Sequence, residues 1–125
     1  MIFLNWTLAV FLLNFSLLLL HEMDAIRAKE WKMFVILKDM KEQTAYFVFS
    51  LLHLPLYFWI IYSITQTSSG KHNYIFLVTD AFLIFHSVIH FFFRKHKANE
   101  FKSFYSKALI YLMGILAMIH LVLYF

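Results

Sequence analysis

Two histidines, His86 and His90, lie four residues apart in the apolar stretch VTDAFLIFHSVIHFFF, residues 78–93. On a helix this spacing puts both imidazoles on one face, about one turn apart, where they can bind a single metal ion. Lipid cannot supply hydrogen-bond partners for an imidazole, so we expect this face to turn towards the other helices of a bundle. The stretch therefore predicts part of a metal site that other segments complete.

Two further histidines come from other apolar stretches and are expected in the same half of the membrane. At a rise of about 1.5 Å per residue, His53 and His86 both lie roughly 12–13 Å from the inner ends of their helices. His90 lies roughly 6 Å deep, and His21 lies near the same rim. Imidazole and carboxylate ligands suit zinc or iron. The predicted metal ligands are His21, His53, His86 and His90, with Glu22 and Asp24 as additional ligands.

Other interpretations of these histidines remain open. His53 and His86 could ligate a haem iron axially from two helices, although bulky Phe and Leu side chains leave little room for a porphyrin. The histidines could instead hold helices together through hydrogen bonds worth on the order of 0.6 kcal/mol each. They could also line a path for a proton or a small solute. The functional hypotheses are therefore a lipid-modifying or redox metalloprotein and, as the alternative, a non-enzymatic accessory or transport protein.

Asp80 and His120 form a separate predicted pair in the outer half of the membrane. On the same count, both lie roughly 20–24 Å from the inner ends of their helices. An ionisable side chain at membrane depth costs about 2.5–3.5 kcal/mol and usually has a partner. We therefore expect the carboxyl group of Asp80 to contact the imidazole of His120.

The elements that must position these side chains are long apolar helices. Of the 125 residues, 62% are hydrophobic and only 14% are charged, too few to cover a soluble domain of this size. Apolar stretches at about 2–20, 44–65, 74–93 and 108–125 each approach the ~20 residues that cross a bilayer. They predict an all-α, integral membrane four-helix up-down bundle, with residues 1–125 forming a single domain.

The basic residues predict how this bundle is oriented. Five Lys or Arg residues lie in the connection 21–43, one in 66–73 and five in 94–107. By the positive-inside rule, the first and third connections face the cytoplasm and both termini lie outside, as in a multi-pass protein of a bacterial inner membrane. The lipid bilayer is then the expected partner, and nucleic acid is not. The sequence contains no GxxxG motif, which would indicate a helix-dimerisation face. A homo-oligomer is therefore possible, but the sequence does not predict one.

The first connection is expected to begin as a continuation of the first helix. HEMDAIRAKEW, residues 21–31, contains no helix breaker, and Arg27 with Glu30 would make an i,i+3 ion pair on that helix. The apolar segment MFVIL, residues 33–37, is flanked by lysines. It is expected either to lie along the inner interface or to fold back onto the bundle.

Several short motifs resemble those of a family of small bacterial four-span membrane proteins of unknown function. The resemblance covers nearly the whole chain. It implies the four-span fold but no activity, cofactor or partner. The motifs that carry it are His21-Glu22-x-Asp24-Ala25, Lys29-Glu30-Trp31, His53-Leu54-Pro55 and the HxxxH of His86 and His90.

Overall fold

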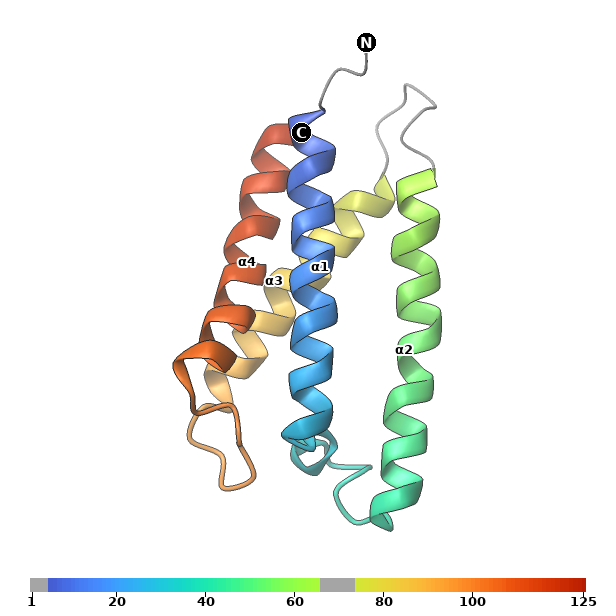
Figure 1. Ribbon diagram of the computed structural model, residues 1–125, viewed down its shortest axis with the longest axis vertical. Coiled ribbons are helices and arrows are strands. Elements are labelled where there is room, and N and C mark those ends of the chain that lie inside the picture. Colours follow the sequence, from blue (N-terminus) through green and yellow to red (C-terminus); the bar gives the residue numbers. More distant parts are fainter. Residues whose placement is uncertain (1–4, 66–73) are drawn as a thin grey trace.

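The computed structural model describes residues 5–65 and 74–125, and in these ranges every regular element is a helix (Figure 1). The four α-helices have 22, 24, 19 and 21 residues, or about 28–36 Å of length at 1.5 Å per residue. Each is long and apolar enough to cross a hydrocarbon core of about 30 Å. The predicted all-α membrane bundle is confirmed. In chain order the elements are α1 (Trp6–Arg27), the short 3-10 helix η1 (Glu30–Met33), α2 (Glu42–Thr65), α3 (Tyr74–Phe92) and α4 (Phe104–Tyr124).

Two helices extend beyond the apolar stretches that were predicted to cross the membrane. α1 continues past the apolar stretch to Arg27, as expected for a segment without a helix breaker. α4 begins at Phe104, earlier than predicted, because the Ser103 side chain accepts a hydrogen bond from the backbone N–H of Ser106. This cap brings Ser106 into the helix, where its side chain faces α1.

Successive helices run in opposite directions, so the beginning of α1 and the end of α4 lie at one end of the bundle (Figure 1). The connections 28–41 and 93–103 lie at the other end, which we call the basic end. α4 packs closely against both α1 and α3. α2 stands further to the side and approaches the rest of the molecule mainly at α3 and η1. The bundle is therefore a close-packed group of three helices with a more loosely attached fourth.

A glycine and a serine set the close approach of α3 and α4. A Cβ atom added at Gly114 would lie 2.7 Å from the Oγ atom of Ser87, so only glycine fits without a shift of the neighbouring chain. Ser87 Oγ donates to the backbone carbonyl of Ile110 across this contact, at 2.7 Å. A small residue and a satisfied hydroxyl therefore let the two helix backbones approach, as in other membrane bundles.

The segment after η1 folds back onto the bundle, which decides between the two expectations for residues 33–37. Met33 and Leu37 are buried, whereas Val35 and Ile36 are 79% and 78% exposed. Leu37 and Met33 belong to an apolar cluster that includes Trp31 and Phe49. This cluster attaches the beginning of α2 to the basic end of α1.

Candidate metal centre

Three histidines and one glutamate converge at the basic end of the bundle. His21 comes from α1, His86 and His90 come from α3, and Glu30 is the first residue of η1. One ligand atom from each of the four lies within 4.8 Å of the others. The Nε2 atoms of His21 and His86 are 3.0 Å apart. Glu30 Oε1 lies 2.8 Å from Nε2 of His90 and 3.9 Å from Nε2 of His86.

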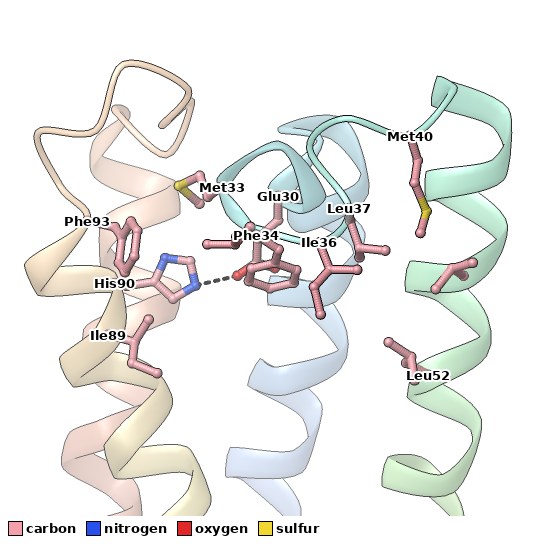
Figure 2. Close-up of a pocket in the computed structure, with 12 residues that line it drawn as sticks. Glu30, Met33, Phe34, Ile36, Leu37, Met40, Leu52, Ile89, His90 and Phe93 are labelled. Atoms are coloured by element: carbon pink, nitrogen blue, oxygen red, sulfur yellow. Dashed lines mark ion pairs between the residues drawn. The ribbon is translucent and has the colours of Figure 1, made fainter.

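Glu30 follows a backbone turn in which one residue, Lys29, has a left-handed conformation. α1 ends at Arg27, and Lys29 has φ 50°, the only positive φ among the described non-glycine residues. This conformation costs an L-residue about 1–2 kcal/mol, so the surrounding contacts must hold it. Because the chain reverses here, the Glu30 side chain points back into the bundle, where Figure 2 shows it facing His90.

The predicted ion pair between Arg27 and Glu30 is therefore wrong. The helix does not reach Glu30, and the Arg27 guanidinium binds Asp24 instead, with Nε 2.7 Å from Oδ1. Glu30 is consequently a site residue that the sequence reasoning missed. No glycine or proline marks the turn at Lys29, so the motif Lys29-Glu30-Trp31 was the only signal that could have drawn attention to it.

Three of the four residues are buried, and His86 is partly exposed. The side chains of His90 and Glu30 are 5% and 4% exposed, and His21 is fully buried. Phe101, from the connection 93–103, lies over the imidazoles of His21 and His90, with ring centroids 5.5 and 4.9 Å apart. His86 is the most open of the four, with 17% of its side chain exposed. Electrostatic interactions in this site are thus weakly screened by water.

The charge of Glu30 is set by the histidines around it. Burial by itself would raise the pKa of the Glu30 carboxyl group. The contact with His90 and the electrostatic interactions with His86, His90 and His21 outweigh burial and lower this pKa to about 2. Glu30 is therefore a carboxylate at physiological pH. A buried carboxylate surrounded by imidazoles is the electrostatic arrangement that a bound cation also needs.

Two nitrogen atoms in the cluster have no hydrogen-bond partner among the described residues. They are Nδ1 of His21 and Nε2 of His90, and both are buried. Nε2 of His90 lies at ion-pair distance from Glu30, but not in the alignment of a regular hydrogen bond. An unpaired buried polar atom usually marks strain, a catalytic role or a missing water or ion.

The spacing of the ligand atoms suits one metal ion. Zinc lies about 2.0–2.1 Å from imidazole nitrogen in a tetrahedral site, which places two ligand atoms about 3.3 Å apart. The separations of 3.0 Å between His21 and His86 and of 2.8 Å between His90 and Glu30 lie slightly below this value. The 3.9 Å between His86 and Glu30 lies above it. Side-chain rotations that bring these atoms, which all lie within 4.8 Å of one another, to about 3.3 Å would give three nitrogens and one oxygen around one ion.

His53 and Glu22, both predicted ligands, lie outside this group and contact each other. The Nε2 atom of His53 is 2.5 Å from Oε2 of Glu22, and its Nδ1 atom is 2.7 Å from the carbonyl oxygen of Phe49. Both imidazole nitrogens are thus occupied. The pair joins α2 to α1, where the two helices otherwise have few contacts.

Asp24, the remaining predicted ligand, connects α1 to α4. One of its carboxylate oxygens binds Arg27, and the other accepts a hydrogen bond from Ser106 Oγ at 2.6 Å. Arg27 also donates to the backbone carbonyl of Glu100 at 3.2 Å. This network holds the connection 93–103, and with it Phe101, over the histidines.

Asp80 and His120 lie side by side in the other half of the bundle. Nδ1 of His120 is 2.5 Å from Oδ2 of Asp80, and both residues are almost completely buried. The rings of Phe11 and Phe76 pack against the imidazole, at centroid distances of 5.1 and 5.4 Å. The second oxygen of Asp80 and Nε2 of His120 have no hydrogen-bond partner among the described residues.

Comparison with known proteins places the chain without assigning an activity. The model of a protein family of unknown function matches residues 7–125, which confirms the resemblance found in the short motifs. No curated protein matches the chain. No solved structure matches it. What the site does must therefore be argued from its own geometry.

Proposed function

The chain belongs to the family of unknown function DUF6713, and we propose that it is a multi-pass membrane metalloprotein that binds one zinc or iron ion. The ligands in this proposal are three imidazoles and one carboxylate. The observation that supports it is the convergence of four ligand atoms, three of them from buried residues, within 4.8 Å from three separate elements. Imidazole and carboxylate together suit zinc and non-haem iron. The proposed ligands are His21, Glu30, His86 and His90.

Two ionisable residues at the basic end, outside the ligand set, are compared with the proposed ligands by the partners that their side chains have. His53 has protein partners at both ring nitrogens, and Asp24 has partners at both carboxylate oxygens. Within the proposed ligand set, Nε2 of His90 is buried without a regular hydrogen bond among the described residues, and a cation would use this nitrogen. A haem between His53 and His86 finds less support, since Glu22 and Phe49 already occupy His53.

The metal proposal is tested by the metal content of purified protein and its variants. The chain is purified in detergent, incubated with zinc or ferrous iron, desalted, and analysed by mass spectrometry of the elements. We expect one ion per chain in the unmodified protein, and loss of that ion in His90→Ala and in Glu30→Gln. His53→Ala is the matched control, because it removes a nearby imidazole that lies outside the ligand set.

Cobalt substitution provides a second, spectroscopic assay of the same site. A tetrahedral cobalt(II) ion with nitrogen and oxygen ligands has visible absorption bands that an unspecific surface ion lacks. We expect these bands in the unmodified protein and in His53→Ala. A folded protein that takes up no stoichiometric metal, or Glu30→Gln and His90→Ala proteins that keep it, would show that the polar residues serve helix packing alone.

The orientation that we propose places the basic end in the cytoplasm and both termini outside, in a bacterial inner membrane. The distribution of five, one and five basic residues over the three connections supports it. The chain has no cysteine, so single cysteines can be introduced at Ser69 and Lys97 without background labelling. Ser69 lies outside the described residues. A membrane-impermeant thiol reagent should reach the two positions from opposite sides, and labelling of both from one side would contradict the orientation.

With a metal at this depth, two kinds of chemistry are open to the protein. Zinc held by these four residues would have to accept a fifth ligand in order to polarise a carbonyl or a water, whereas iron would support a redox step. Both would act on molecules that reach the basic end through the membrane, so a lipid-modifying or redox role follows from the proposed metal.

A proton path is the second candidate, and the observation that favours it is the buried Asp80–His120 pair, which the metal centre does not explain. Reconstituted vesicles with an internal pH indicator test it. Proton flux that Asp80→Asn abolishes would support the path. Vesicles that hold a pH gradient as well as protein-free vesicles would exclude it.

A further inference from the structure

An apolar cavity of about 580 Å³ lies directly beside the metal centre (Figure 2). It is bounded by α3, by α2, and by η1 with the segment that follows it, and it is partly open at the surface. Twelve residues line it, and Glu30 and His90 are the two polar ones. The remaining lining is aliphatic, aromatic or thioether, as Met33, Ile89 and Phe93 illustrate. The polar part of the cavity is thus the edge of the metal centre itself.

The loose attachment of α2 explains why this space exists and what surrounds it. α2 approaches α3 at few places, and its residue Leu52, which lines the cavity, is 61% exposed. Both helices are apolar enough to cross a membrane, so the surface around Leu52 faces hydrocarbon rather than water. A molecule that enters between α2 and α3 therefore comes from the lipid phase.

The volume and the lining limit the ligand class. Pockets for small ligands measure roughly 300–1,000 Å³ and are mostly apolar with a few polar groups that fix orientation. A water-soluble metabolite would leave its polar groups unpaired against this lining. A hydrocarbon chain would satisfy the apolar wall and could place one oxygen-bearing group at Glu30 and His90.

Basic residues beside the cavity indicate the charge of the headgroup. Lys32, Lys38 and Lys41 alternate along the chain with the lining residues 33–37 and 40, and all three are exposed. Basic residues near a membrane surface attract anionic lipid. Glu30 itself would repel a negative group inside the cavity. A phosphate is therefore expected at the lysines, and a neutral ester carbonyl inside.

Resting on the proposed metal centre, we infer that this cavity binds one acyl chain of an anionic phospholipid, with the ester carbonyl of that lipid next to the metal held by Glu30 and His90. The lipid phase supplies the ligand. The lysines select its headgroup, and the cavity takes its chain. This inference names the substrate class of the proposed metalloprotein.

Photo-crosslinking in lipid nanodiscs tests the inference. The probes are phosphatidylglycerol and phosphatidylcholine analogues that carry a diazirine in one acyl chain, and the crosslinked residues are mapped by peptide mass spectrometry. We expect crosslinks at the cavity residues of α2, α3 and the segment 33–40, at least severalfold more with the anionic probe. Crosslinks spread evenly over the lipid-facing surfaces of all four helices would overturn the inference.

Cavity-filling variants make the test specific. Ile89→Trp places an indole in the cavity and should remove most of the crosslinks there. Val78→Trp is the control on the same helix, because Val78 is exposed and does not line the cavity. Leu52→Trp, at a position that is already exposed, repeats the test if Ile89→Trp folds poorly. Equal cavity crosslinking in Ile89→Trp, Leu52→Trp and Val78→Trp would overturn the inference.

Replacement of the three lysines tests the headgroup. The variant Lys32→Gln/Lys38→Gln/Lys41→Gln should lose the preference for the anionic probe and keep its crosslinking to the neutral one. Lys102→Gln, at the same end but in the other connection, should keep the preference. Metal content is measured on every sample. A missing metal, which contradicts the proposed function, is thus distinguished from dispersed crosslinks, which contradict the lipid site.

Discussion

The buried pair of Asp80 and His120 offers a quantitative test of how polar groups are stabilised inside this bundle. Their side-chain atoms approach to 2.5 Å, and the two side chains are 0% and 1% exposed. A hydrogen bond to a charged group contributes about 1.5–3 kcal/mol. Removal of one partner of a buried ion pair costs about 3–5 kcal/mol, because the other charge is left without compensation.

These values predict a strong coupling between two substitutions. His120→Gln leaves Asp80 without its imidazole partner and should lower the free energy of unfolding by about 3–5 kcal/mol. Asp80→Asn leaves the imidazole able to contact an amide, so its loss should be nearer 1.5–3 kcal/mol. In the double variant neither charge remains. Its loss should therefore be smaller than the sum of the single losses by about 2–3 kcal/mol.

Equilibrium unfolding in mixed micelles, with increasing fractions of sodium dodecyl sulfate, measures these differences. The matched control combines Asp80→Asn with His96→Gln, because His96 lies in the connection 93–103 at the opposite end of the bundle. Losses of residues far apart should add within about 0.5 kcal/mol. If the losses of Asp80→Asn and His120→Gln also add to that accuracy, the pair does not stabilise the bundle in the way argued.

Three further predictions concern contacts and a backbone turn elsewhere in the bundle. Gly114→Ala should destabilise the protein by about 1–3 kcal/mol, because its Cβ would lie 2.7 Å from Ser87 Oγ, and Ser87→Gly in the same chain should restore much of the loss in the same unfolding assay. Lys29→Gly should raise the melting temperature, because glycine adopts φ 50° without the cost of about 1–2 kcal/mol that lysine incurs; an unchanged or lower melting temperature would contradict a strained turn. Ser106→Ala removes the 2.6 Å hydrogen bond to the buried Asp24 carboxylate and should lower the free energy of unfolding by about 1.5–3 kcal/mol. A loss below about 0.5 kcal/mol would mean that Arg27 alone satisfies that carboxylate.

The sequence by itself determined the helices and which faces of them turn inward. Four stretches too apolar for water predict four membrane-spanning helices, since backbone polar groups in lipid must be paired within the helix. The spacing of His86 and His90 places them on one face, and the same argument turns this face towards the protein. These inferences rest on composition and local periodicity, which the chain contains independently of its tertiary contacts.

Only the tertiary structure decided which polar groups meet. The predicted depths of His53 and His86 are nearly equal, yet the ring of His53 binds Glu22, because α2 stands apart from the close-packed α1, α3 and α4. Glu30 enters the site because Lys29 adopts a left-handed conformation that no glycine or proline announces. Depth along a helix follows from counting residues, but the distance between helices depends on long-range packing. The local sequence does not encode that distance. The distance between helices decides both which residues form the ligand set and how large the neighbouring cavity is.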